Sequence, residues 1–584
     1  MITQIQLGNL FNENGRTVIS GGGSGLDVES LVNELATAKR QPAVILEDKV
    51  KNNEKISTAL GDFKKKLETL KDSANFLRSP SGVQNAADNI FDYRKSNISS
   101  NTSVAGSTYL DVTAVPGAGI GEFEIEVNQL ATRNNYTTNT FALADVSSVA
   151  VGGGGPFNAG TLTLGAGGYT MTLTAGDTLN NVVAKINSVK NLSGVEASII
   201  KVSNGNYRVS FKSLDTGAQN NYDINALNPG IFNTGFALLD DADDSSITFD
   251  GTTIMRSTNS IDDIVDGLTF NLKQTTPAAT KLTVGVEADK DLAKQGIMNF
   301  VNAYNDLKLF AAKQTAVGDD GKPLTDSVLA NNSTVSQIFS KITGELASVV
   351  DGITSGDPAR LGDLGIKFAD FPGDNETPFT RNILQVDEDK LDSVLESNFD
   401  KVRKVFEFDY VSDNANLQIF QRTNALNTSS VSLNINRTSD IYQATYNDPT
   451  TGLPVTVDFD YEELSDGSVV LTGPKNSAID GLLMIYADSA DATVNLSMSQ
   501  GIGDRVFNSL DDTLDDTTGA LTVALNALSD DNERYNTEIT KIDDQISKYR
   551  DQLLDKFAAL EKAISAANTL LQSLDAQSRA QQNS

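Results

Sequence analysis

Two long heptad patterns, one near each end of the chain, constrain the fold more than any other feature. In the N-terminal pattern, apolar residues alternate at spacings of four and three from position 56, after an earlier Leu46; they are Ile56, Leu60, Phe63, Leu67, Leu70, Ala74 and Leu77. The C-terminal pattern comprises Tyr535, Ile539, Ile542, Ile546, Tyr549, Leu553, Phe557, Leu560, Ile564, Ala567, Leu571 and Leu574. This spacing is typical of helices that pair as coiled coils. As helices, residues 46–77 and 535–574 would span about 48 Å and about 60 Å.

Several residues interrupt these patterns. Asn53 and Lys49 fall at seam positions, where polar side chains can fix register at a cost in stability. Asp27 follows a run of glycines and is a suitable N-cap for a helix to about Arg40, before Pro42. We expect Pro42 either to kink the helix or to lie early in a second, longer one. Two consecutive four-residue steps around Leu553 predict a stutter, which locally unwinds a supercoil.

The middle of the chain is rich in predicted strands. Residues 161–164 and 169–174 alternate apolar and polar side chains around a glycine turn, and residues 195–202 and 207–211 flank an Asn-Gly turn. Helical spacing occurs at 178–189 and at 291–313, where Ile297, Phe300, Tyr304 and Leu307 share one face. Further strands are expected at 247–272 and at about 410–500. The fold class is therefore α+β: an antiparallel α-helical coiled-coil stalk formed by the N- and C-terminal regions, with inserted β-rich head domains.

The composition excludes many kinds of chemistry. The 584 residues include no Cys, His or Trp, so thiolate nucleophiles, Ser–His triads and Cys or His metal ligands are absent. The net charge of −31 argues against nucleic acid and anionic membranes as partners. This charge is uneven: residues 31–80 carry +3, whereas residues 440–532 carry −15. No cofactor, metal site or catalytic residue is predicted.

Four motifs could suggest chemistry, and each has a simpler interpretation. The glycines at 21–25 lack the Gly-Lys-Ser/Thr of a phosphate-binding loop. The acidic runs at 240–244 and 511–516 lack the spacing of an EF-hand, so a solvated surface is favoured. The carboxylates at 458–463 could contain a glycosidase pair, but so acidic a chain offers many such pairs. The lysines at 64–66 suit the solvated face of a helix, with partner docking as the alternative.

Several segments together resemble the bacterial flagellar filament cap family, also called hook-associated protein two. The segment SGLDVESLVNELATAKRQP at 24–42 resembles the N-terminal signature of that family, and GEFEIEVNQLA at 121–131 resembles the strand that opens its head domains. DTLNNVVAKINS at 177–188 resembles a repeat shared with flagellin-type proteins. The most specific pair is DGLTFNLK at 266–273 with FVNAYNDL at 300–307. LGDLGIKF at 361–368 and the segment 384–406 resemble another family block, and the strand-rich segment at about 410–500 is longer than a minimal cap requires.

The resemblance implies a structural protein rather than an enzyme. It implies a homo-oligomer of about five or six copies at the distal tip of the filament, where the cap promotes folding and insertion of exported flagellin. It also implies passage through the flagellar type III export apparatus with an export chaperone, without a cleaved signal peptide, to an extracellular position. Neither nucleic acid nor membrane is an expected partner. An extracellular adhesin, whose acidic β-rich head binds surface glycans or host ligands, stays open as the alternative.

The resemblance and the patterns together divide the chain. We expect flexible ends at 1–26 and 575–584, stalk helices at 27–80 and 501–574, and a helical leg domain with short strands at 289–408. A head β domain is expected from 81–135 with 240–288, an outer head β domain inserted at 136–239, and an additional β-rich insertion at 409–500. The apolar heptad residues above are the candidate assembly residues, and Phe300, Tyr304 and Leu307 the candidate leg core.

Overall fold

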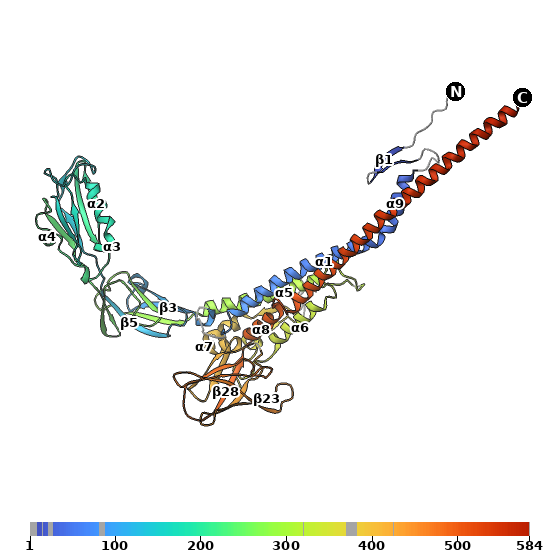
Figure 1. Ribbon diagram of the computed structural model, residues 1–584. Helices are drawn as coiled ribbons and strands as arrows, with labels where there is room; N and C mark the ends of the chain where they lie inside the picture. Colours follow the sequence, from blue (N-terminus) through green and yellow to red (C-terminus); the bar gives the residue numbers. More distant parts are fainter. Residues whose placement is uncertain are drawn as a thin grey trace. The chain divides into compact units, whose positions relative to one another are not determined.

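The computed structural model describes residues 9–13, 16–20, 27–80, 88–318, 320–369, 382–423 and 425–582. It divides into two compact units (Figure 1). The first unit comprises residues 1–75, 298–391 and 404–584, and the second comprises residues 76–297 and 392–403. Helices and antiparallel strands together confirm the α+β class.

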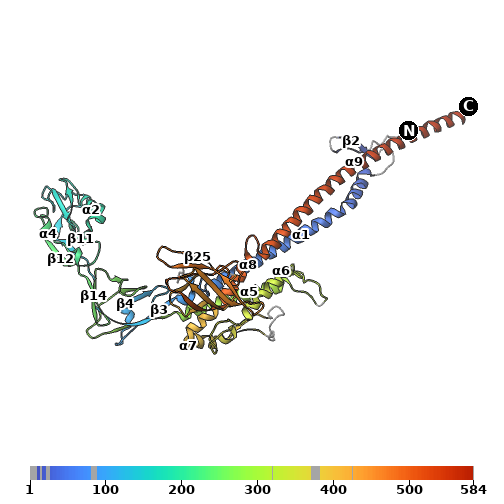
Figure 2. The same cartoon turned by 60° about the horizontal axis from the view of Figure 1, so that its bottom comes forward.

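Two long helices of the first unit, α1 (Val28–Asn75) and α9 (Ala520–Gln582), run side by side in opposite directions (Figures 1 and 2). Their contacts fix the direction, because partners of Arg40, Asn53 and Lys64 on α1 are Asp543, Asn532 and Asp516 respectively. The predicted antiparallel pairing of the chain's two ends is therefore confirmed.

The start of α1 follows one sequence prediction and corrects another. The Asp27 carboxylate accepts a hydrogen bond of 3.1 Å from the Ser30 backbone N–H, so the predicted N-cap is confirmed. Of the two expectations for Pro42, a place early in a second helix is wrong, because the single helix α1 runs through it. The kink stays a prediction. Pro42 has no N–H to donate to the Ala38 carbonyl, and the adjacent Ala43 is fully buried.

Shorter helices pack around the second half of α1. They are α6 (Ser333–Ala347), α8 (Ile502–Leu514) and the part of α5 (Lys290–Gln314) that belongs to the first unit. The ring of Phe63 on α1 lies 5.8 Å from that of Phe339 on α6. A two-stranded sheet of β18 (Ile366–Phe368) and β19 (Leu384–Val386) precedes α7 (Glu388–Phe406), which contains a non-helical residue at Asn398.

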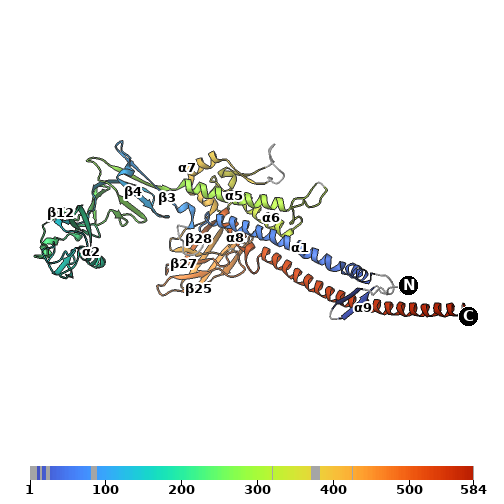
Figure 3. The same ribbon diagram turned by 90° about the horizontal axis from the view of Figure 1, so that it is seen from above.

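Residues 408–500 of the first unit form a β-sandwich. The five-stranded sheet has the order β20 (Phe408–Ser412), β28 (Ala492–Gln500), β22 (Ser430–Asn436), β23 (Ile441–Asn447) and β24 (Pro454–Asp458). The four-stranded sheet has the order β21 (Leu417–Gln421), β27 (Leu483–Tyr486), β26 (Val469–Thr472) and β25 (Asp460–Glu463) (Figure 3). Both sheets contribute to a single core, which includes Leu433, Leu471 and Met484.

The second unit contains two groups of sheets, each with its own apolar core. The first group has a five-stranded sheet, in the order β14 (Thr252–Arg256), β13 (Ser245–Phe249), β5 (Gly121–Gln129), β17 (Leu282–Ala288) and β3 (Arg94–Ser100). It also has a three-stranded sheet of β15 (Ser260–Ile261), β16 (Leu268–Leu272) and β4 (Leu110–Ala114).

The second group is built around β10 (Val195–Ser203), β11 (Asn206–Ser213), β6 (Asn135–Thr138) and β12 (Phe236–Asp240), with β7 (Phe141–Ala142) beside β11. The predicted turn between β10 and β11 is confirmed, and Gly205 has the left-handed φ of +75° that this tight turn requires. The hairpin of β8 (Gly160–Leu164) with β9 (Tyr169–Leu173) and the helix α2 (Leu179–Ser188) are also confirmed.

The flexibility expected at 1–26 and 575–584 stays a prediction. The helix α9 continues to Gln582. Within the segment 1–26, a hairpin joins β1 (Asn9–Glu13) to β2 (Arg16–Ser20), and β2 contacts α9. The glycine run at 21–25 lies outside the described residues.

Candidate assembly surfaces of the helical region

The N-terminal heptad residues form a core where α1 meets the shorter helices. Leu60, Phe63, Leu67 and Leu70 on α1 are fully buried. Leu77, which belongs to the second unit, is also fully buried. Leu46 and Ile56, nearer the start of the pattern, are only half-buried. The candidate leg residues Phe300, Tyr304 and Leu307 on α5 are also fully buried. The structure therefore brings the second half of the N-terminal pattern into a packed bundle rather than a two-helix seam.

Several polar contacts join the two helices in the middle of the α1–α9 pair. Asn53 on α1 and Asn532 on α9 share a side-chain hydrogen bond of 3.0 Å. The ammonium of Lys49 lies 5.4 Å from the ring centre of Tyr535, and that of Lys39 lies 4.0 Å from the ring centre of Tyr549. Cations at such distances are attracted to the ring face. Both polar seam positions noted in the sequence, 49 and 53, therefore face α9.

Arg40 bridges the two long helices. Its guanidinium donates to Asp543 on α9 at 2.7 Å and 3.1 Å, and to Glu47 on α1 at 2.7 Å. The hydrogen bond from Arg40 is the main cause that lowers the pKa of the Asp543 carboxyl from its ordinary value, while the two carboxylates raise the pKa of Arg40. The ion pair is thus fully charged at neutral pH.

The C-terminal heptad residues become exposed along α9. Ile546 is buried, and Tyr535, Ile539, Ile542, Tyr549, Leu553, Phe557 and Ile564 are half-buried. Leu560, Leu571 and Leu574 are 45%, 63% and 52% exposed. Because Val28 and Val32 at the start of α1 pack against Leu554, the part of α9 after Phe557 continues past the N-terminus of α1 (Figure 2). An apolar stripe on this end of α9 therefore faces solvent.

The lysines at 64–66 do not share one environment. Lys64 pairs with Asp516 at 3.5 Å, and the Lys66 ammonium lies 5.9 Å from the ring centre of Phe310 on α5. Lys65 is exposed and pairs with Asp62 on its own helix. Two of the three thus stabilise the bundle, and only Lys65 fits the interpretation of a solvated face.

The β-sandwich is anchored to the helices by a buried ion pair. Arg422, after β21, donates to the Asp504 carboxylate on α8 at 2.5 Å, and their side chains are 6% and 0% exposed. The Arg422 guanidinium also lies 4.2 Å from the ring centre of Phe408. Arg505, the next residue on α8, donates to the backbone carbonyls of Glu345 and Val349 at the end of α6, and burial lowers its pKa.

The acidic motifs are engaged in structural contacts. Asp511 pairs with Lys71 at 2.5 Å, and Asp512 lies 3.8 Å from Lys341. Asp515 accepts hydrogen bonds from the backbone and side chains of Thr517 and Thr518, which lower its pKa. In the described residues no cluster of three or more acidic side chains has an arrangement that could hold a metal ion. No helix in those residues has the length and apolar character needed to cross a membrane.

The candidate glycosidase carboxylates lie on the edge strands β24 and β25. Asp458 accepts a hydrogen bond of 2.9 Å from the Gln443 side chain, and Glu463 pairs with Arg437 at 3.0 Å. A hollow of about 510 Å³ on the sandwich is lined by other residues, among them Asn427, Thr445 and Arg505. The geometry therefore does not bring these four carboxylates into that hollow.

Comparison with known protein families shows to which family this chain belongs. The model of the flagellar hook-associated protein 2 C-terminus matches residues 242–569, more than half of the chain. The chain belongs to the flagellar hook-associated protein 2 family. The model of the N-terminus of the same family matches residues 24–134, and the flagellin hook IN motif matches residues 161–215. The resemblance seen in the sequence is thereby confirmed, and the adhesin alternative is not favoured.

Individual members of the hook-associated protein 2 family match over most of their length. The A-type flagellar hook-associated protein 2 of Pseudomonas aeruginosa is 27% identical, over 67% of this chain and 80% of that protein. The Escherichia coli K12 flagellar hook-associated protein 2 is 26% identical, over 65% and 77%. The solved D1-D2-D3 domains of the flagellar cap protein FliD from Escherichia coli align over 59% of this chain and 89% of that one, with 24% identity and a TM-score of 0.43.

Sequence reasoning missed several residues of this hook-associated protein. Leu554 packs against the start of α1 although it is outside the heptad pattern, and the stutter at Leu553 was the only signal for it. Ala36 and Ala43 are buried on α1, but small residues beside a proline do not stand out in an apolar pattern. Arg422 and Asp504 are 82 residues apart, so nothing local indicated their pairing.

Proposed function

We propose that this hook-associated protein is a structural protein of the filament cap, located outside the cell at the distal tip of the bacterial flagellum. About five or six copies form the cap, and the cap promotes folding and insertion of exported flagellin. The proposal is supported by the match of the flagellar hook-associated protein 2 family over more than half of the chain. The chain reaches the tip through the flagellar type III export apparatus, assisted by an export chaperone.

The observation that carries the mechanism is the exposed apolar stripe at the end of α9. Three of its seam leucines, Leu560, Leu571 and Leu574, expose apolar surface beyond the start of α1. A helix with such a stripe gains free energy by packing against another helix. In the proposed cap, this end docks on the helical termini of the subunits at the filament tip, while the bundle and the β domains stay outside that contact.

No covalent chemistry is part of the proposal. The described surfaces act by burying apolar area and by pairing charges, and no described residue is assigned a catalytic role. The cap thereby holds a place in which newly exported flagellin folds before the cap moves onward.

Deletion of the gene tests this function. Electron microscopy of the deletion strain should show short or absent filaments, and monomeric flagellin should accumulate in the culture medium. Complementation with the full-length gene should restore both. Filaments of normal length in the deletion strain would contradict the proposal.

A further inference from the structure

The two outer faces of the β-sandwich differ in chemical character. In the five-stranded sheet, the residues of β22 and β28 that point away from the core are all polar and uncharged: Ser430, Ser432, Asn434, Asn436, Thr493, Asn495 and Ser497. In the four-stranded sheet, the corresponding residues of the central strands β26 and β27 are Val470, Thr472, Leu483 and Ile485. Outer faces of antiparallel sheets are usually polar, so the four-stranded sheet is the exception.

The apolar residues on this face do not serve the core. Val470, Leu483 and Ile485 are half-buried, and none belongs to the sandwich core, whereas their neighbours Leu471 and Met484 do. Phe420, on the adjacent edge strand β21, is 44% exposed. Val470 and Ile485 are direct cross-strand partners. We call Phe420, Val470, Leu483 and Ile485 the apolar sheet face.

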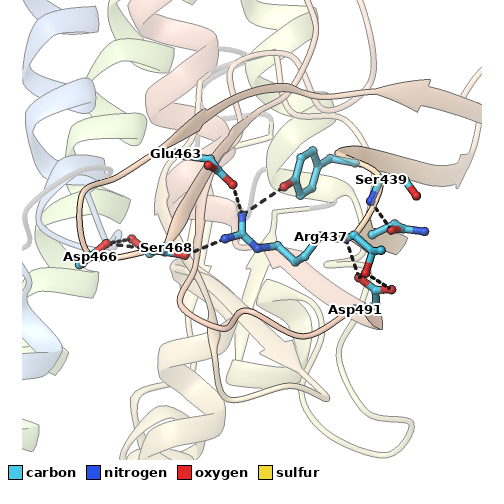
Figure 4. Close-up of polar contacts among 10 residues, drawn as sticks. Arg437, Ser439, Glu463, Asp466, Ser468 and Asp491 are labelled. Atoms are coloured by element: carbon cyan, nitrogen blue, oxygen red, sulfur yellow. Dashed lines mark hydrogen bonds and ion pairs between the residues drawn. The ribbon is translucent and has the colours of Figure 1, made fainter.

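Contacts at both ends of the sandwich hold this face in place. At one end, Arg437 after β22 donates to the Glu463 carboxylate at 3.0 Å and to the Gly467 carbonyl at 2.8 Å, joining the five-stranded sheet to the turn between β25 and β26 (Figure 4). At the other end, the buried pair of Arg422 and Asp504 fixes the sandwich to α8. A preformed face costs little conformational entropy when a partner binds.

Charge argues for the kind of partner. On the same outer face, β25 places Glu462 beside Val470 and Asp460 beside Thr472, and neither carboxylate has a hydrogen bond or ion pair in the described part of the chain. Residues 408–500 contain twelve Asp and Glu against three Lys and Arg, a net charge of −9. Two such faces would repel each other, so an isologous contact is disfavoured. A partner segment that has exposed apolar side chains and a positive net charge would complement this face.

This chain carries a segment of opposite charge itself. Segment 31–80 has a net charge of +3, and its helix α1 exposes Leu31, Leu35 and Ile45. A ring of identical subunits requires a heterologous contact, in which two different patches meet. We propose that the apolar sheet face docks a second copy of this chain in the cap. This inference rests on the self-association in the proposed function.

The apolar sheet face is too small to hold two subunits together by itself. Stable interfaces contain about 20–30 residues a side, and the apolar sheet face has four. The contact therefore acts only in concert with other contacts between the same two subunits, as neighbouring contacts in a closed ring do.

Site-specific photo-crosslinking tests the inference directly. A photoreactive phenylalanine analogue at position 420 of the full-length protein, in assembled caps, should yield a band of twice the chain mass, with both peptides from this sequence. The matched control places the analogue at position 434, on the polar outer face of the other sheet, and should give far less of that band. Crosslinks from position 420 to flagellin alone, or none while caps assemble, would overturn the inference.

A pair of substitutions gives an independent measurement. Val470→Ser with Ile485→Ser should raise the concentration for half-assembly in sedimentation velocity by at least about tenfold. Asn434→Ser, on the polar face, should leave it unchanged. If the double variant loses its thermal transition, Phe420→Ser at the exposed edge replaces it. If a folded variant assembles like the wild type, the inference about the apolar sheet face is wrong, but the proposed self-association is not affected. If the wild-type chain never assembles, the proposed self-association is wrong as well.

Discussion

Asn53 on α1 and Asn532 on α9 form a side-chain hydrogen bond of 3.0 Å in the middle of the antiparallel pair. Position 53 belongs to the heptad seam, where an apolar residue would bury more surface. A polar pair at a seam loses its hydrogen bond when the helices slide, so it favours one register over the others. The pair thereby determines how far the exposed end of α9 extends past the start of α1.

Replacing both asparagines should change the register of α1 against α9 and the stability of the two helices in opposite ways. Asn53→Ala should lower the free energy of unfolding by about 0.5–1.5 kcal/mol, the usual contribution of a hydrogen bond. Asn53→Leu with Asn532→Leu should raise the melting temperature of the helices but broaden the distance between spin labels on α1 and α9, measured by electron paramagnetic resonance. A narrow, unchanged distance distribution in the double variant would show that the asparagines do not set the register.

Leu67 supplies a test of the bundle core. Its side chain is fully buried on α1, so Leu67→Ala should cost about 2–5 kcal/mol, and Leu67→Asp should abolish the bundle because it buries a charge. Helical circular dichroism during thermal unfolding measures both effects. The control is Leu571→Ala at the exposed end of α9, where a change within about 0.5 kcal/mol is expected. Equal effects at the two leucines would contradict the described packing.

The pair of Arg422 and Asp504 should be necessary for attachment of the β-sandwich. Asp504→Asn leaves the Arg422 charge buried without its carboxylate, and breaking a buried pair in this way costs about 3–5 kcal/mol. Limited proteolysis should then cut the connections at 407 and 501 sooner than in the wild type. Asp460→Asn, at the exposed edge of the same domain, is the matched control. Cleavage at the wild-type rate in Asp504→Asn would mean that other contacts hold the sandwich.

Acid should weaken the stalk through Asp543. Because the hydrogen bond from Arg40 lowers the folded pKa of Asp543 below its ordinary 3.8, its stabilisation is complete above that value and is lost as the pH falls through the folded pKa. Both side chains are partly exposed, so solvent screening keeps the contribution of the pair small. The stability difference between wild type and Asp543→Asn should shrink between pH 6 and pH 2. A difference that stays constant over this interval would rule out the charged pair as its source.

The elements were predictable where local patterns were strong. Alternation and an Asn-Gly turn were enough for the hairpin of β10 and β11, and heptad spacing was enough for α1 and α9. A second helix near Pro42 was wrongly expected because the local penalty of proline is visible in the sequence, whereas the burial of the adjacent Ala43 is not.

Some candidate assembly residues are buried and others are exposed, and the heptad pattern could not indicate which. The same heptad spacing leads to full burial at Leu60 and to an exposed side chain at Leu571, because the outcome depends on where the partner helix ends. Likewise, the apolar sheet face is evident only when strand register shows that Val470 points away from the core. In both examples, the exposure of a side chain depends on contacts between residues that are far apart in the sequence.

The central claim is that the exposed end of α9 places this protein on the filament tip. The most direct measurement is the partition of flagellin between filaments and medium in a strain whose only copy carries Leu560→Ser, Leu571→Ser and Leu574→Ser. These residues are exposed, so the variant should fold and be exported like the wild type. The account predicts that flagellin appears mainly as monomer in the medium, with short or absent filaments. Full-length filaments and no free flagellin, with the variant exported at the wild-type level, would contradict it.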